Sequence, residues 1–378
     1  MSSLWRRKKP ASNMASPAKS YSNQKYLLSI IDMFYSIALL LVFLGSGLSL
    51  FLENLIGYFG IAGYLSIPVF LLIILFAYYL LSLPLNFYAG FTLEHKFSLT
   101  KQKVSSWWLD QLKSAVLGYI IFLILISCFY WILANFSQWW LVVSIFWIAF
   151  SVVLAKLTPV LIIPLFFKYR KLEDEVLRQR IFNLAQKMRV KLLDVFEIDF
   201  SKKTLKANAA FCGMGKSKRV ILADTLKDKY TYDEIEAILA HEFAHFQRKH
   251  ILKLIIINSL LTLGLFYLIF RTNVYFLGVF RLDSLGQLAS LPLVFLYFAI
   301  FGIISRPLEA YVSRRFEREA DSLALKITRN KEAFVSLMEK LAGQNLADRN
   351  PHPLIKFFFF DHPPIDERIK LAKSHPSQ

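Results

Sequence analysis

The sequence predicts a mainly α-helical, polytopic membrane protein with about six spans and a soluble domain that the spans divide into two parts. Hydrophobic residues make up 56% of the 378 residues, compared with roughly 45–50% in an ordinary soluble domain. They are concentrated in blocks of about 20 residues, which is the length that a helix needs to cross a bilayer. Polar, strongly basic stretches separate and follow these blocks. We therefore treat the blocks as spans and the polar stretches as the soluble domain.

The chain divides into five parts in this interpretation. Residues 1–25 are basic and serine-rich, which is typical of a disordered cytoplasmic tail. The next block is too long for a signal peptide and lacks a small-residue cleavage site, so it predicts an uncleaved span. Spans one to four occupy 26–168 and spans five and six occupy 251–310, and between and after them lie the soluble parts 169–250 and 311–378. The six predicted spans are about 27–52, 65–88, 114–135, 140–166, 251–271 and 287–310.

The net charge of +18 has two interpretations. Nucleic-acid binding is one, but loops rich in Lys and Arg alternate here with loops that lack them, as in membrane proteins. This alternation places both termini and the soluble domain on the cytoplasmic side, of either a bacterial inner membrane or the endoplasmic reticulum. We therefore expect the protein to contact membrane lipids and not to bind nucleic acid. We also expect a monomer. With only Cys128 and Cys212 present, zinc sites made of thiolates are excluded by count, and a disulfide framework is not expected.

Local patterns predict the elements of the soluble domain. Helical spacing covers 171–190, and strands are expected at 195–200, 207–212 and 220–223, the last two joined by a hairpin turn at Gly213–Lys216. Thr231 and Glu234 form a capping-box pattern, so a helix should begin at 232 and continue into the span at 251. The second soluble part should be helical to about 344 and end in a short helix at 364–373.

The predicted helix from 232 carries His241-Glu242-Phe243-Ala244-His245. This HExxH pattern places two imidazoles one turn apart, about 40° around the helix axis, with a carboxylate beside them. Such a face can bind zinc, and Glu242 could then take a proton from water and pass it to a leaving amine. The alternative is an amphipathic helix with two structural histidines.

A third zinc ligand is required from elsewhere in the chain. His250 lies five residues beyond His245, about 140° around a continuous helix, so it should face away from the pair. Glu317 and Asp321 share a helical face after the sixth span, which predicts a His₂Glu, gluzincin-like site. Asp321 would orient a ligand histidine. Alternatively, Glu317 and Glu319 are surface charges among neighbouring arginines.

Four ordered motifs resemble those of the CaaX prenyl protease type 1 family of integral-membrane zinc metallopeptidases, which is related to the HtpX-type proteases. The resemblance covers most of the chain from about residue 65 onward. The motifs are Leu83-Pro84 through Glu94-His95-Lys96-Phe97, Asn208-Ala209-Ala210-Phe211 followed by 218–226, Ser313-Arg314-Arg315-Phe316-Glu317 with Ala320-Asp321, and His362-Pro363-Pro364-Ile365-Asp366-Glu367-Arg368.

The resemblance implies a role for each site residue. His241, His245 and Glu317 would bind one zinc ion per chain, with Glu242 as the catalytic base. It further implies that His362 donates to the oxyanion and that Arg368 lies near the cleft. An edge strand containing Asn208 and Ala209 would pair with an extended substrate.

The implied fold is a ring of tilted helices around a chamber that the zinc domain closes. Members of the family have seven spans, so the six predicted here leave one fewer at the N-terminal end. The leading interpretation is a zinc metalloendopeptidase that cleaves peptides near the membrane, with prenylated CaaX tails as one candidate substrate. An HtpX-like quality-control protease is the alternative. A transporter with structural zinc is disfavoured because the first four spans are nearly free of charge and no repeat is evident.

Overall fold

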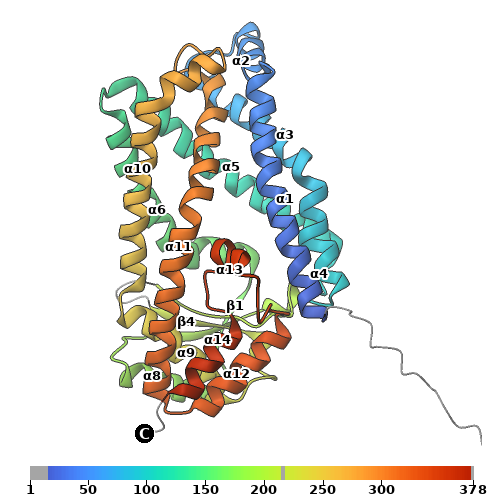
Figure 1. Ribbon diagram of the computed structural model, residues 1–378, viewed down its shortest axis with the longest axis vertical. Coiled ribbons are helices and arrows are strands. Elements are labelled where there is room, and N and C mark those ends of the chain that lie inside the picture. Colours follow the sequence, from blue (N-terminus) through green and yellow to red (C-terminus); the bar gives the residue numbers. More distant parts are fainter. Residues whose placement is uncertain (1–15, 214–217, 376–378) are drawn as a thin grey trace, which may run out of the picture.

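A computed structural model describes residues 16–213 and 218–375. Six helices in this part of the chain are long and apolar enough to cross a membrane, as predicted. They form the upper part of the molecule in Figure 1, and the sheet lies at the other end with most helices of the two soluble parts. The spanning helices are α1 (Pro17–Gly45), α3 (Ser66–Phe87), α5 (Val104–Asn135), α6 (Trp139–Leu157), α10 (His250–Val279) and α11 (Leu291–Thr328). The chamber expected between them stays a prediction.

The first span differs from its prediction at both ends. The Ser16 side chain accepts a hydrogen bond from the backbone of Lys19 and Pro17 occupies the first turn, so α1 begins at residue 17. The predicted tail is therefore wrong for residues 17–25, while 1–15 lie outside the described residues. The predicted span is interrupted at Gly47, which has φ 77°, and α2 (Leu48–Tyr58) follows as a separate helix. With 11 residues, α2 is too short to cross a bilayer.

Short helical segments extend several spans. A π-helical turn, Tyr88–Thr92, and α4 (Leu93–Lys96) continue α3, while a second π-helical turn, Thr158–Ile162, and α7 (Ile163–Phe166) continue α6. Single 3₁₀ turns lie at Gly63–Leu65, Phe200–Lys202, Asp224–Leu226 and Leu288–Ser290. The last span, α11, runs on without a break from the membrane segment into the second soluble part.

A four-stranded sheet has the order β1-β2-β4-β3. The predicted hairpin pairing is confirmed, because β3 (Ala209–Cys212) and β4 (Arg219–Ala223) are antiparallel neighbours; residues 214–217 of its turn lie outside the described residues. β2 (Asp194–Ile198) is parallel to β4, and β1 (Tyr169–Lys171), which was not predicted, pairs with β2. Strand β3 is thus at the edge of the sheet, with one side unpaired by the described strands.

Four helices share a hydrophobic core with this sheet and the lower part of α11 (Figure 1). They are α8 (Glu175–Lys187), α9 (Tyr232–Gln247), α12 (Lys331–Gln344) and α14 (Ile365–Ser374). A further helix, α13 (Pro353–Phe359), lies beside the middle of α11, where Arg306 and Arg314 contact its segment. Ala240 and Ala244 of α9, and Ala320 and Ala324 of α11, are completely buried in the same core. Small side chains allow two helix backbones to approach closely, so the alanines bring the faces of α9 and α11 together.

The predicted continuous helix from 232 into the fifth span is wrong. Helix α9 ends at Gln247, and α10 begins at His250. Lys249 between them has φ 57°, in the left-handed region that L-residues seldom adopt. The break changes the direction of the chain just after the HExxH pattern.

Candidate active site

The position of α9 is fixed at its first turn. The Thr231 hydroxyl accepts from the backbone N–H of Glu234, and Glu234 Oε2 accepts from the backbone N–H of Thr231 at 2.7 Å, which completes the predicted capping box. Glu234 is buried and also accepts from Ser336 Oγ at 2.6 Å and Lys340 Nζ at 2.7 Å on α12. Burial alone would raise the pKa of Glu234, but these partners outweigh it and hold the pKa below its usual value. The helix that carries the HExxH pattern is thus anchored to α12.

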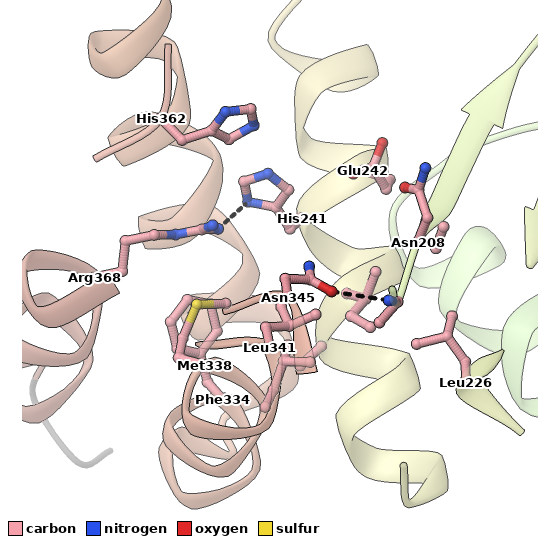
Figure 2. Close-up of a pocket in the computed structure, with 15 residues that line it drawn as sticks. Asn208, Leu226, His241, Glu242, Phe334, Met338, Leu341, Asn345, His362 and Arg368 are labelled. Atoms are coloured by element: carbon pink, nitrogen blue, oxygen red, sulfur yellow. Dashed lines mark hydrogen bonds between the residues drawn. The ribbon is translucent and has the colours of Figure 1, made fainter. Parts of the chain in front are cut away.

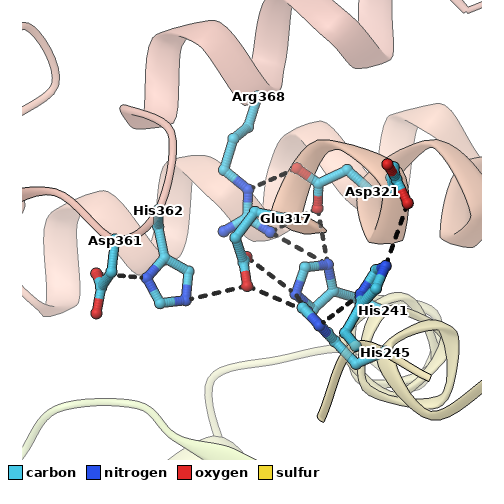
Figure 3. A network of polar contacts seen from close by, with 9 residues as sticks. His241, His245, Glu317, Asp321, Asp361, His362 and Arg368 are labelled. Atoms are coloured by element: carbon cyan, nitrogen blue, oxygen red, sulfur yellow. Dashed lines mark hydrogen bonds and ion pairs between the residues drawn. The ribbon is translucent and has the colours of Figure 1, made fainter. Parts of the chain in front are cut away.

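His241, His245 and Glu317 meet at one point (Figure 3). His241 Nε2 lies 3.2 Å from Glu317 Oε2, His245 Nε2 lies 3.1 Å from Glu317 Oε1, and the two Nε2 atoms are 3.0 Å apart. The alternative in which Glu317 is a surface charge is wrong, because only 5% of it is exposed. Its Oε2 is buried, and although His241 Nε2 approaches it at 3.2 Å, no contact with the geometry of a hydrogen bond reaches it among the described residues. Two imidazole nitrogens and a carboxylate converging in this way could hold a metal ion.

A buried ion pair supports His241 from behind (Figure 3). His241 Nδ1 is 2.8 Å from Asp321 Oδ1, and Arg368 Nε and Nη2 donate to the same carboxylate at 2.8 and 2.6 Å. Burial would lower the pKa of His241, but the adjacent carboxylates of Asp321 and Glu317 outweigh it and raise the pKa to about 9. When the ring loses one proton, Nδ1–H donates to Asp321 and the lone pair of Nε2 is directed at the point where the three side chains meet.

His250 contacts His245, although the sequence predicted that it would face away from the two histidines of the HExxH pattern. Its Nδ1 is 3.1 Å from His245 Nδ1 and its Nε2 is 3.3 Å from Glu319 Oε2. The expectation assumed a continuous helix, and the break at Lys249 invalidates it. Nothing local marks that break, because the chain has neither Gly nor Pro there. The sequence also did not reveal that Glu319, a surface charge in one alternative, would be the partner of His250.

His362 approaches the triad from the loop before α14. Its side chain is 54% exposed, and its Nε2 lies 3.5 Å from Glu317 Oε1. Its Nδ1 donates to Asp361 Oδ1 at 2.8 Å, and this bond, together with the charge of nearby Glu317, raises the pKa of His362. Asp361 was not predicted, although its position directly before a site histidine is a usable signal.

A cavity of about 230 Å³ opens beside these residues. Figure 2 shows Asn208 and Glu242 on one side and His362 and Arg368 on the other, with His241 between them. Ala209, the first residue of edge strand β3, also lines it. Glu242 has no hydrogen-bond partner among the residues described, so its carboxylate is available to a ligand. The structure thus brings every site residue expected from the sequence to this cavity or to the triad beside it.

Comparison with known proteins identifies the family. Residues 171–375, more than half of the chain, match the family described as "Peptidase family M48". The chain belongs to peptidase family M48. Residues 12–168 of this M48 peptidase also match "CAAX prenyl protease N-terminal, five membrane helices", where the described residues form four helices of spanning length and the shorter α2.

Individual relatives agree with this assignment. The M48 peptidase is 31% identical to the uncharacterized metalloprotease YhfN of Bacillus subtilis over 94% of its length and 84% of the relative's. It is 33% identical to CAAX prenyl protease 1 of Saccharomyces cerevisiae over 77% of its length and 68% of the relative's. The crystal structure of S. mikatae Ste24p superposes with a TM-score of 0.84 at 29% identity, covering 94% of this chain and 88% of that one.

These findings confirm the predicted fold class and activity at the level of the family. The protein is an integral, multi-pass membrane metalloprotease with a mainly helical fold and a small sheet. Its family implies a metal cofactor, and a peptide or protein as substrate. The transporter interpretation is set aside, because the chain belongs to a peptidase family.

Proposed function

We propose that this protein is a zinc endopeptidase that hydrolyses peptide bonds at the cytoplasmic surface of its membrane. The observation that carries the proposal is the convergence of His241 Nε2, His245 Nε2 and a Glu317 oxygen within 4.8 Å of one another, beside a cavity. Two nitrogens and one oxygen are a ligand set that zinc prefers. The buried Glu317 Oε2, which accepts no well-formed hydrogen bond from the described residues, supports a cation there, because a buried carboxylate oxygen otherwise loses its hydration with little compensation. Zinc, when bound, acts as a Lewis acid and makes water a stronger nucleophile.

Two residues that line the cavity have separate roles in hydrolysis, one in proton transfer and one in stabilising the oxyanion. Glu242 accepts the proton of the attacking water and returns it to the leaving amine. His362 donates a hydrogen bond to the oxyanion that develops on the scissile carbonyl. Its Nδ1–H is already committed to Asp361, so Nε2 is the atom that faces the substrate and donates when the ring is protonated.

Three further residues bind or position. Asn208 lies directly before edge strand β3, Ala209 is the first residue of that strand, and both line the cavity together with Glu242. An extended peptide that adds to this edge would place a backbone carbonyl over the site, and main-chain hydrogen bonds would hold it there. Arg368 holds Asp321, and through it His241.

The names of the relatives support a proposal for the substrate class. One of them is named CAAX prenyl protease 1, so we propose that the substrates include C-terminal prenylated CaaX tails. Damaged membrane proteins, as for an HtpX-like quality-control protease, are the alternative. Cleavage of a farnesylated CaaX peptide compared with its unprenylated twin separates the two, because equal rates would contradict the CaaX proposal. We further propose a lipid-embedded monomer with cytoplasmic termini, on the basis of the alternation of basic loops.

Glu242→Gln tests the catalytic assignment. The amide cannot accept the proton from water, so cleavage should fall by about 10²–10⁴-fold, while zinc content stays near one per chain. Glu236→Gln is the matched control, because Glu236 lies on the same helix and pairs instead with Arg180. Retained cleavage in zinc-loaded Glu242→Gln protein would contradict the role of Glu242.

Glu317→Ala tests the ligand assignment independently of activity. Loss of one of three protein ligands should lower zinc affinity so far that dialysed protein retains little metal. Glu339→Ala removes an exposed carboxylate on α12 and serves as the control. Unchanged metal content in dialysed Glu317→Ala protein would refute the assignment.

A further inference from the structure

His250 is the buried polar group closest to the triad to which the proposed mechanism gives no task. It is the first residue of α10, so it belongs to a membrane-spanning helix and not to the helix that carries His241 and His245. It is nevertheless completely buried. The left-handed turn at Lys249 returns it towards α9.

His250 can accept a hydrogen bond from His245 and donate one to Glu319, but the reverse arrangement is not possible, because a carboxylate accepts only. If His245 directs Nε2 at the triad, its Nδ1 carries the proton and donates to His250 Nδ1 at 3.1 Å. His250 must then hold its own proton on Nε2, which donates to Glu319 Oε2 at 3.3 Å. The network of the two rings and the carboxylate therefore selects one tautomer for each histidine.

Helix α11 holds the ring of His250 in place. The ring stacks on Phe316, with centroids 4.4 Å apart and an angle of 6° between the planes. Phe316 and Glu319 are three residues apart, so they share one face of α11. Glu317, on the same turn, points to the triad instead. One helical turn thus supplies both the carboxylate of the triad and the support for His250.

We propose that His250, supported by Glu319, is the positioning residue for His245, as Asp321 and Arg368 are for His241. The inference rests on the proposed zinc site, and it identifies the residues that would orient the second ligand histidine. Each of the two ligand histidines then has a buried acceptor on Nδ1. Such acceptors fix ring orientation and tautomer, and their loss commonly lowers metal affinity or activity by 10–100-fold.

Four variants of the full-length protein in detergent test this role. His250→Phe keeps a ring to stack on Phe316 and removes the acceptor. His250→Asn retains an acceptor, because Oδ1 occupies the position of Nδ1. Glu319→Leu removes the end of the relay, and Arg315→Leu is its control, since Arg315 touches Glu319 from outside at 3.4 Å without touching His250.

Zinc affinity is measured by competition with a chelator, and the visible spectrum of the Co²⁺-substituted protein reports ligand geometry. We expect His250→Phe to weaken zinc binding about 10–100-fold and to alter the Co²⁺ spectrum. Glu319→Leu should weaken it about 3–10-fold. His250→Asn and Arg315→Leu should stay within about threefold of wild type, with an unaltered spectrum.

Unchanged zinc affinity and spectrum in folded His250→Phe protein would overturn the proposal. If that variant does not fold, Glu319→Leu decides in the same way, because Glu319 lies at the partly exposed end of the relay. Equal losses in His250→Asn and His250→Phe would also overturn it, since they would indicate a packing role. Wild-type protein that binds no zinc would instead refute the proposed function itself, so the two failures are distinguishable.

Discussion

Asp321→Asn should destabilise the fold and weaken metal binding together. Asp321 is 0% exposed and accepts two hydrogen bonds from Arg368, which is itself only 9% exposed. The amide has nearly the same shape but no charge, so the variant leaves a buried guanidinium without its counterion. Removing one partner of a buried ion pair costs about 3–5 kcal/mol. We expect a loss near the lower end, about 3 kcal/mol, because the amide oxygen still accepts one hydrogen bond.

The effect on metal binding has a separate cause. His241 Nδ1 is 2.8 Å from Asp321, and a neutral amide holds the ring less firmly than a carboxylate does. Zinc affinity should fall by about 10–100-fold, which corresponds to about 1.4–2.7 kcal/mol. Denaturant unfolding of metal-free protein measures the first effect, and chelator competition measures the second.

Asp194→Asn is the matched control for this prediction. Asp194 is also a buried carboxylate, 8% exposed, and it pairs with Arg178 and Lys171 on the sheet and α8. It should lose stability and keep zinc affinity. Wild-type unfolding free energy in Asp321→Asn protein would refute the argument from the buried pair. An equal loss of zinc affinity in both variants would refute the argument from His241.

Three other predictions concern pH and the two ends of α9. The pKa of His241 in metal-free protein is about 9, above its ordinary 6.5, so its contribution to stability is complete below pH 6.5 and is lost as pH rises through 9. Zinc must displace that proton, so chelator competition should show affinity rising about tenfold per pH unit up to pH 9; a flat profile would contradict this. Lys249→Gly should raise the free energy of unfolding by up to about 1 kcal/mol, because φ is 57° there; a loss in denaturant titration would be evidence against strain. Thr231→Ala should lower the same quantity by about 1 kcal/mol through loss of the cap, and an unchanged midpoint would contradict the cap's contribution.

Features governed by local or one-dimensional patterns were predictable from the sequence. The six spans follow from hydropathy, because a bilayer requires a long apolar run whatever its neighbours are. The capping box of α9 involves residues three positions apart. The start of α1 was also locally encoded by Ser16-Pro17, and the basic composition of the tail obscured it.

Features that depend on distant contacts were not predictable in this way. Strand β1 has only three residues and exists through pairing with β2. The left-handed Lys249 occurs in a sequence without a helix breaker, and the tertiary contacts of His250 with Phe316 and Glu319 hold the chain beyond it. One alternative placed the arginines near Glu317 at the surface, yet Arg314 is buried and donates to the backbone oxygens of Lys356 and Phe360 near α13. In each case the partner lies on another segment, so no local pattern contains the information.

Helix α11 connects the membrane segment directly to the catalytic centre, because one helix contains both the span and Glu317. From Leu291 to Glu317 the helix rises about 39 Å, so a tilt of about 2° at its membrane end would displace Glu317 by about 1.4 Å. Misplacement of a reacting group by about 1 Å can slow catalysis about 100-fold. Membrane thickness influences the tilt of spanning helices, so we expect the rate of cleavage to depend on the thickness of the lipid bilayer around α11.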